Sequence, residues 1–320
     1  MAIWLSEADV RTLLSMPELI DAMQTALEAF SAGRVNQPVR TVIQAPDGVF
    51  ASMPAYVNAP AAMGAKLVTV FHGNESKGLP THLATIVLLD PETGGLLAIL
   101  DGRFITEVRT AAVSAVAARY LAGEQARVLA IIGSGVQARS HLEALSLVRK
   151  FDEIRCWSRS ETKREQFVSE QPGYPIRAVN SAEEAVRGAD VVVLVTSSAT
   201  PVIADAGVKP GACVISVGAC LPSQREMDPA LVARGRLFVD SRPGALKESG
   251  DIVQGIREGR FTEDHIAAEL GAVVANPRLG RTSESQVTIF KSLGLAVEDV
   301  AAAELAYRHA QGKGTGAAIA

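Results

Sequence analysis

The segment Val128-Leu-Ala-Ile-Ile132-Gly133-Ser-Gly135-Val-Gln-Ala138 constrains the fold more than any other part of the chain. An apolar run that leads into G-x-G-x-x-A and then into a helix-like stretch is typical of a strand-turn-helix unit that binds a dinucleotide. The first glycine permits a tight turn, the second lets a pyrophosphate approach the backbone, and the alanine allows close packing of helix on strand. The helix N-terminus then faces the phosphates. We therefore expect a bound dinucleotide, the alternative being an ordinary glycine turn.

The end of the next strand-like segment indicates which dinucleotide binds. Ser158, Arg159 and Ser160 directly follow residues 153–157, about where the motif places its ribose-binding residue. An acidic residue there would bind a ribose 2′-hydroxyl and repel a 2′-phosphate, whereas an arginine between two hydroxyls can bind that phosphate. We therefore expect NADPH in preference to NADH. The alternative is that Arg159 is only a solvated charge at a strand end.

The second part of the chain is predicted to form a Rossmann-type, doubly wound parallel sheet. Strand-like and helix-like segments alternate there, which implies parallel strands with helices on both faces. The expected strands are 127–132, 153–157, 176–179, 190–195, 212–217 and 237–239.

The N-terminal part has a different, α+β pattern. Helices are expected over 15–30 and 104–121, with short β-like segments between them. These segments are 39–44, 49–57, 65–71, 83–90 and 96–100. A last helix over 296–310 is expected to rejoin the N-terminal domain, and the tail 312–318 to be frayed. We therefore expect a discontinuous domain over 1–120, completed by 296–320, and an NADP-binding domain over 121–295.

Composition and charge favour a protein that acts on small molecules. The 320 residues are 48% hydrophobic and carry a net charge of −4 without a basic cluster, so neither nucleic acid nor a membrane is an expected partner. The first residues lack the pattern of a secretory signal, and no apolar run approaches the roughly 18 residues of a membrane span. Three cysteines without CxxC spacing fit a reducing compartment, and we expect a cytoplasmic location.

Several common catalytic arrangements are absent from the sequence. No lysine stands four residues after any of the four tyrosines, and neither a zinc-binding cysteine pair, an HExxH segment nor a GxSxG elbow occurs. We therefore expect no metal, and a reaction in which a nicotinamide ring exchanges hydride with a polarised carbon.

Three cations stand in otherwise apolar segments of the N-terminal part: Arg40, Lys66 and Arg109. A cation inside an apolar element needs an anionic partner, so together they suggest a cradle for a substrate carboxylate. The alternative for each is a side chain that reaches water along an apolar stem. Glu248, near a predicted strand end where α/β ligands collect, is an equally ambiguous acid.

A set of segments occurs in one order along nearly the whole chain: Lys66-Leu-Val-Thr, Asp101-Gly-x-x-Ile-Thr-x-x-Arg109-Thr-Ala-Ala-Val-Ser-Ala, Gly135-Val-Gln-Ala, Lys247-Glu-Ser-Gly-Asp251 and Phe290-Lys-Ser-Leu-Gly-Leu-Ala-Val-Glu-Asp299. In these segments the chain resembles the ornithine cyclodeaminase/mu-crystallin family. The resemblance implies a homodimer in which the N-terminal domain, completed by the C-terminal helix, supplies the dimer sheet and part of the substrate site.

The resemblance also implies roles for individual residues. The substrate contacts that it implies are Arg40, Lys66, Arg109, Cys220, Glu248 and Ser292, of which Lys66, Arg109 and Glu248 are the catalytic candidates. The cofactor contacts, counting the glycine motif, are Thr81, His82, Thr110, Gly133, Gly135, Val136, Gln137, Ser158, Arg159, Ser160, Thr196 and Val217. Among these, His82 is expected to orient the ligand or touch the cofactor rather than bind a metal.

The chain departs from the cyclodeaminase pattern at one position. Cyclodeaminases of the family carry an aspartate after the Val-Gly-Ala of their fifth strand, where this chain has Val217-Gly-Ala-Cys220. A largely neutral thiol is a poorer proton acceptor than a carboxylate, so the chain is more similar to the family's ketimine reductases. The alternative for Cys220 is a small packing residue without chemistry.

We therefore expect NADPH-dependent reduction of a small ketimine carboxylate, such as Δ1-pyrroline-2-carboxylate or Δ1-piperideine-2-carboxylate, to L-proline or L-pipecolate. Alternatives on the same fold are an alanine dehydrogenase, an N-alkyl amino-acid dehydrogenase and an ornithine cyclodeaminase. An alternative of another class is a non-catalytic, NADPH-dependent binding protein.

Overall fold

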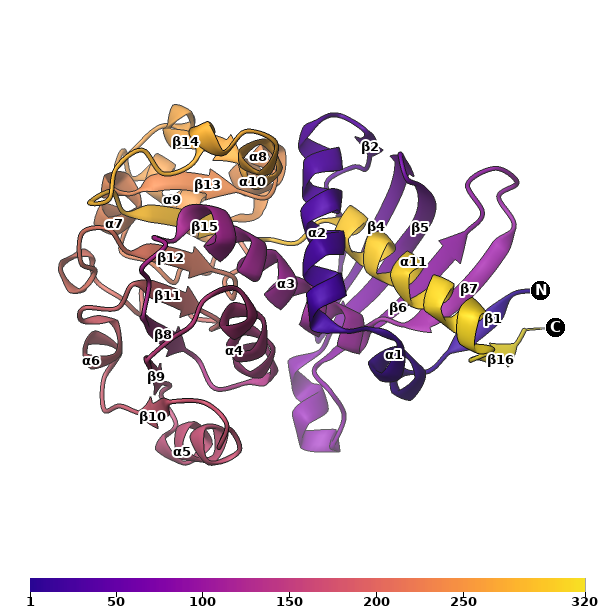
Figure 1. Cartoon of the computed structure of the whole chain (residues 1–320), viewed down its shortest axis with the longest axis horizontal. Coiled ribbons are helices and arrows are strands. Elements are labelled where there is room, and N and C mark those ends of the chain that lie inside the picture. The colour runs from indigo at the N-terminus through magenta and orange to yellow at the C-terminus, as the bar shows by residue number, and fades with distance from the viewer. Residues whose placement is uncertain (320) are drawn as a thin grey trace. The chain divides into compact units, whose positions relative to one another are not determined.

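The computed structural model describes residues 1–319, which fall into two compact units (Figure 1). The first unit contains residues 1–109 and the chain from Gly294 onward, and the second contains Thr110–Leu293. The chain passes from one unit to the other inside helix α3 (Arg103–Leu121), which we had expected to close the first domain. No helix in the described part of the chain is long and apolar enough to cross a membrane.

The first unit is built on a largely antiparallel sheet. Its long strands pair in chain order: β4 (Gly48–Asn58), β5 (Ala61–Val70), β6 (His82–Leu89) and β7 (Leu96–Asp101). One edge carries β2 (Val35–Asn36) and β3 (Thr41–Ala45), and the other carries β1 (Ile3–Leu5) and β16 (Ala317–Ala318). The expectation of a frayed tail is therefore wrong, because β16 pairs with β1 and holds the chain end to the sheet.

Helices lie on one face of this sheet: α1 (Glu7–Leu13), α2 (Met16–Ser31) and α11 (Ala296–Lys313). A 3-10 turn at His72–Lys77 connects β5 to β6. Helix α11 crosses β4, β5 and β6 (Figure 1). Gly64 permits the close approach of β5 to β6, because an added Cβ would lie 2.5 Å from the Val87 carbonyl oxygen, whereas Val300 of α11 lies at an ordinary contact distance of 3.5 Å. Burial alternates along β5, so Lys66 faces the helix side and Leu67 the opposite face.

The second unit contains a parallel sheet in the order β10-β9-β8-β11-β12-β15-β13-β14, which confirms the doubly wound fold class. Its strands are β8 (Val128–Ile132), β9 (Glu153–Trp157), β10 (Ile176–Ala178), β11 (Val191–Leu194), β12 (Cys213–Ser216), β13 (Arg236–Val239), β14 (Ile266–Glu269) and β15 (Thr288–Lys291). Its helices are α4 (Val136–Val148), α5 (Glu161–Ser169), α6 (Ala182–Val186), α7 (Pro229–Arg234), α8 (Arg242–Glu248), α9 (Gly250–Arg257) and α10 (Leu270–Ala275). Three 3-10 turns lie at Asp205–Gly207, Glu263–His265 and Pro277–Leu279.

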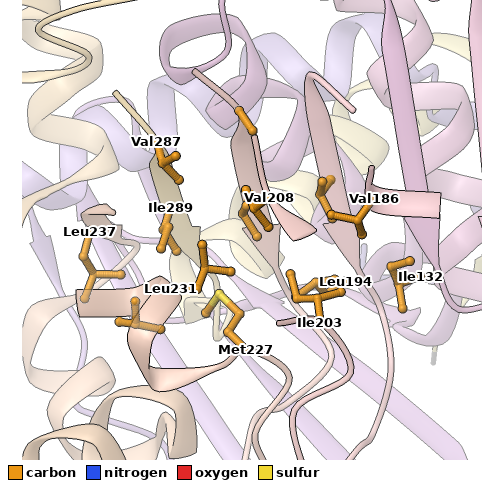
Figure 2. Close-up of a cluster of buried hydrophobic side chains, with 14 of the residues drawn as sticks. Ile132, Val186, Leu194, Ile203, Val208, Met227, Leu231, Leu237, Val287 and Ile289 are labelled. Carbon is orange, nitrogen blue, oxygen red and sulfur yellow. The ribbon is translucent and has the colours of Figure 1, made fainter. Parts of the chain in front are cut away.

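An apolar cluster packs between these strands and neighbouring helices (Figure 2). Ile132, Leu194 and Ile289 contribute to it from the sheet, and Val186 and Leu231 from helices α6 and α7. Burial of each large apolar side chain contributes roughly 1.5–3 kcal/mol, so the strands form a rigid base for the loops that follow them.

Candidate functional site

The glycine motif forms the turn between β8 and α4. Gly133 has a φ of +127°, and a Cβ there would lie 2.8 Å from the Val195 carbonyl oxygen, so this position excludes a side chain. Gly135 caps α4 with an ordinary φ of −87°, and a Cβ there would meet no other atom within 4 Å. The first backbone N–H groups of a helix lack intrahelical partners, so the open space beside Gly135 fits a pyrophosphate.

The predicted ribose-binding residues lie next to this turn. The Ser134 hydroxyl donates to Ser158 Oγ at 2.9 Å, which joins the glycine turn to the loop after β9. The Ser158 hydroxyl donates to the Ser160 carbonyl oxygen at 3.1 Å, and Ser160 caps α5. Arg164 supports the loop from below by donating to the Ser158 carbonyl oxygen at 3.2 Å, while Arg159 is exposed. The loop thus presents an exposed cation and small hydroxyl residues at the strand end.

The other candidates of the second unit lie mostly in loops that follow strands. Thr196 and Val217 come after β11 and β12, and Ser292 comes directly after β15. The Ser292 hydroxyl and the Leu293 N–H both donate to the fully buried Asp240 carboxylate, at 3.4 and 2.5 Å. Such an edge, outside the carboxyl ends of parallel strands, is where doubly wound folds bind ligands.

Cys220 and Glu248 lie in two segments that pack closely together, the loop before Gln224 and the end of α8 next to Gly250. Cys220 is half-buried, and its thiol donates to the Val217 carbonyl oxygen at 3.2 Å. Glu248 is the last residue of α8. Two residues later, Gly250 packs so tightly that an added Cβ would lie 1.8 Å from the Gln224 carbonyl oxygen. The internal hydrogen bond of the Cys220 thiol agrees with a packing role for this residue.

The cations of the first unit form a buried cluster with two acids of α11. Lys66 Nζ lies 2.7 Å from Asp299 Oδ2, and Arg109 contacts Asp299 Oδ1 at 3.0 Å and Glu298 Oε2 at 2.6 Å. Lys66 and Arg109 are only 2% and 4% exposed, so they do not extend to water as the alternative interpretation required. Arg40 donates to the Gly294 carbonyl oxygen at 2.9 Å. Lys66 and Arg109 thus pair with acids of the chain itself, and the contact of the three cations with a substrate carboxylate stays a prediction.

We call Arg40, Lys66, Arg109, Glu298 and Asp299 the cationic cluster. Three cations and two carboxylates give it a formal charge of +1, which suits an incoming carboxylate. Glu298 and Asp299 were not predicted as partners of these cations, although they stand in the segment Ala296-Val-Glu-Asp299 that resembles the family. Two adjacent acids in an apolar helix start are the signal that could have revealed them.

The cluster changes the proton affinity of its neighbours. Burial lowers the pKa of Lys66 to about 8 against the opposing effect of Asp299, and the charges of Arg109 and Arg40 lower it further. Burial lowers the pKa of His82, the first residue of β6, to about 4, helped by the positive charges of Lys66 and Arg109. His82 is therefore a neutral imidazole near pH 7. Thr81 directly precedes it, and Thr110 directly follows Arg109 as a buried residue of α3.

The structure thus divides the predicted residues between the units. Arg40, Lys66, Thr81, His82 and Arg109 belong to the first unit, and the others to the second. Within residues 1–319, no group of three or more His, Cys, Asp or Glu residues could hold a metal ion.

The sequence model of the ornithine cyclodeaminase/mu-crystallin family matches residues 2–314. The chain belongs to this family. A relative within it, the ketimine reductase mu-crystallin of Rattus norvegicus, is 43% identical over 300 residues, which covers 92% of this chain and 93% of the relative. The predicted family is therefore confirmed.

Two solved structures of family relatives are closely similar to this chain. The Δ1-pyrroline-2-carboxylate reductase of Thermococcus litoralis, in complex with NADH and L-proline, has a TM-score of 0.96 at 38% identity, covering 99% of this chain and all of the relative. An archaeal alanine dehydrogenase dimer with bound NAD has a TM-score of 0.95 at 33% identity, covering 100% and 99%. The fold class is confirmed, and the predicted class of enzyme, a nicotinamide-dependent reductase, agrees with these relatives.

Proposed function

We propose that the protein reduces a small ketimine carboxylate, such as Δ1-pyrroline-2-carboxylate or Δ1-piperideine-2-carboxylate, to the corresponding L-amino acid with NADPH. The observation that carries the proposal is the cationic cluster, which buries Lys66 and Arg109 and keeps a formal charge of +1. A substrate carboxylate is the anion that such a cluster best accommodates. The names of the relatives, ketimine reductase and Δ1-pyrroline-2-carboxylate reductase, support this class of substrate.

The residues of the cluster have distinct roles in this proposal. Arg109 and Arg40 bind and orient the carboxylate, because guanidinium groups stay charged and present several fixed donors. Lys66, with a pKa of about 8, can both bind the carboxylate and supply a proton to the reacting nitrogen. Glu248 is the alternative proton donor. The nicotinamide, when bound, supplies the hydride.

The proposed preference for NADPH rests on the loop after β9. Arg159 is exposed between Ser158 and Ser160, and no carboxylate stands in this segment to repel a 2′-phosphate. We expect kcat/KM to be at least about tenfold higher with NADPH than with NADH, and Arg159→Ala to remove most of this ratio. Equal values of kcat/KM for the two cofactors in the wild type would contradict the preference.

We also propose a homodimer formed through the uncovered face of the first unit's sheet. Trp4, Leu67 and Leu83 are 38%, 39% and 40% exposed, and alternation along their strands turns them away from the helices. A row of large exposed apolar side chains on one sheet face is typical of an interface, and the archaeal alanine dehydrogenase relative is a dimer. Light scattering should give a dimer mass, and Leu67→Lys should yield monomer.

A spectrophotometric panel of NADPH oxidation tests the reaction. It compares both cyclic ketimines, pyruvate with ammonia, and pyruvate with methylamine at equal concentrations. We expect the highest kcat/KM with a cyclic ketimine. Faster turnover of pyruvate with ammonia would favour an alanine dehydrogenase, and ammonia release from L-ornithine with NAD would favour a cyclodeaminase. A flat response throughout would favour the non-catalytic binding protein.

A further inference from the structure

The second unit buries a carboxylate that the proposed chemistry does not use. Glu226 is fully buried, and its Oε1 accepts hydrogen bonds from the Thr196 backbone N–H at 2.7 Å and the Thr196 hydroxyl at 2.8 Å. Its Oε2 accepts from the Ser216 hydroxyl at 3.0 Å and from the N–H groups of Gly218 and Ala219 at 2.9 and 3.2 Å. One side chain therefore joins the loop after β11 to the loop after β12.

A buried lysine and a second acid complete this arrangement. Lys291 Nζ lies 3.0 Å from Ser216 Oγ and 3.2 Å from Asp251 Oδ2, and Asp251 Oδ1 accepts from the N–H groups of Glu226 and Met227 at 2.9 Å each. Burial raises the pKa of Glu226 above its usual range, and the ammonium of Lys291 opposes this rise. We call Glu226, Asp251, Lys291 and Ser216 the acidic hub. It links the ends of β12 and β15 to the start of α9.

We propose that Glu226 is a positioning residue for the nicotinamide cofactor: it holds the backbones of Thr196 and of Gly218–Ala219 in the conformation that cofactor binding requires. These loops follow β11 and β12, on the same strand-end edge as the glycine turn after β8. Ligands of doubly wound sheets bind at that edge. The two loops also touch directly, since a Cβ on Gly218 would lie 1.9 Å from the Thr196 carbonyl oxygen. The inference rests on the proposed cofactor site.

The chain offers a matched control at the opposite edge of the same sheet. Asp190 precedes β11, and its Oδ2 accepts from the N–H groups of Arg127 and Val128 at 2.7 and 2.8 Å, as Glu226 does for its own loops. The amino ends of the strands lie away from the expected cofactor edge. Asp190 differs in being 24% exposed and paired with Lys209, so the two variants are compared by the Kd for the cofactor and not by stability. A purely structural role for Glu226 predicts that both variants weaken cofactor binding.

Glu226→Gln keeps the size of the side chain but places an amide N–H2 against backbone N–H groups, of Thr196 or of Gly218 and Ala219, that can only donate. Leaving buried donors unsatisfied weakens the arrangement that they support, so we expect the Kd for NADPH, measured by calorimetric titration, to rise by about tenfold or more. The kcat at saturating NADPH should change less than the Kd. Asp190→Asn should lower the Tm while leaving the Kd within about twofold of the wild type.

A Kd within twofold of the wild type in folded Glu226→Gln, or an equal loss of affinity in Asp190→Asn, would overturn the inference. If Glu226→Gln does not fold, Ser216→Ala removes one hydroxyl donor to Glu226 together with one acceptor of Lys291 Nζ, and its Kd should rise by about threefold. An unchanged Kd there would count against the inference. Titration with NADH runs in parallel. A wild type that binds neither nucleotide would overturn the proposed function, and with it this inference, which distinguishes that failure from the other two.

Discussion

Each unit of the molecule buries a group of charged side chains, and the formal net charges of the two groups have opposite signs. The cationic cluster of the first unit has three cations for two carboxylates, whereas the acidic hub of the second unit has two carboxylates for one lysine. In the hub, backbone N–H groups satisfy the excess carboxylate oxygen atoms, as they do around Glu226. The hub is therefore internally satisfied, and the cluster is suited to an external anion.

The difference follows from the backbone that surrounds each group. The hub lies among loops at strand ends, where free N–H groups are available to a carboxylate. The cluster lies between β5 and the first turn of α11, where the β5 N–H groups are paired within the sheet. Helix α11 supplies two carboxylates there, and in the proposed function the substrate carboxylate is the further anion.

The largest effect is expected from Arg109→Met in the cationic cluster. The variant leaves the buried Glu298 and Asp299 carboxylates without their guanidinium partner and removes a cation proposed to bind the substrate carboxylate. Steady-state kinetics should show kcat/KM for the ketimine reduced by at least about a hundredfold. Arg103→Met is the matched control on the same helix, because Arg103 pairs with Glu7 where both are partly exposed. Equal losses in the two variants would contradict a specific role for the cluster.

Lys291→Met tests whether the acidic hub behaves differently. It leaves Asp251 and Glu226 buried without their cation, so chemical denaturation should show a loss of about 3 kcal/mol in the free energy of unfolding. The KM for the ketimine, measured at saturating NADPH, should stay within about twofold of the wild type. If Lys291→Met lowered kcat/KM for the ketimine as much as Arg109→Met does, the acidic hub and the cationic cluster would act on the same ligand.

The features that could be predicted from the sequence are those with local signals. The turn at Gly133 and the apolar strands around it follow from backbone sterics and short-range patterning, and they are present as expected. Strand β15 was not predicted, because its four residues, Thr288–Lys291, mix apolar and polar side chains without a clear period. The short β16 depends on pairing with β1 at the other end of the chain.

The charged partners could not be predicted for a related reason. Asp299 meets Lys66, and Glu226 meets Thr196, only because the fold brings distant segments together. A single sequence shows that a buried cation needs an anion but does not show which acid supplies it. Lys66 and Arg109 were recognisable, since each stands in an apolar segment that is buried, whereas Arg40 precedes the largely exposed strand β3 and is half-buried.

The pH dependence separates Lys66 from the two arginines of the cluster. Its pKa of about 8 means that the ammonium form, which binds a carboxylate, is present below pH 8 and is lost as the pH rises above it. From the titration of Lys66 alone, we expect kcat/KM for the ketimine to fall by about fivefold between pH 8 and pH 9. Lys66→Arg stays charged in this range, so its profile should retain only the titration of the substrate imine. Identical alkaline limbs in both enzymes would contradict a role for the Lys66 proton.

The smallest effect on stability and activity is expected from a solvent-exposed ion pair. Arg187 and Glu183 of the α6 region lie 2.6 Å apart but are 75% and 69% exposed, so solvent screens their attraction. Arg187→Ala should change the free energy of unfolding by less than about 1 kcal/mol and leave every kinetic constant unaltered. A loss comparable to that of Lys291→Met would mean that burial does not separate the hub from an ordinary surface pair. The comparison of the two buried groups would then need a different physical basis.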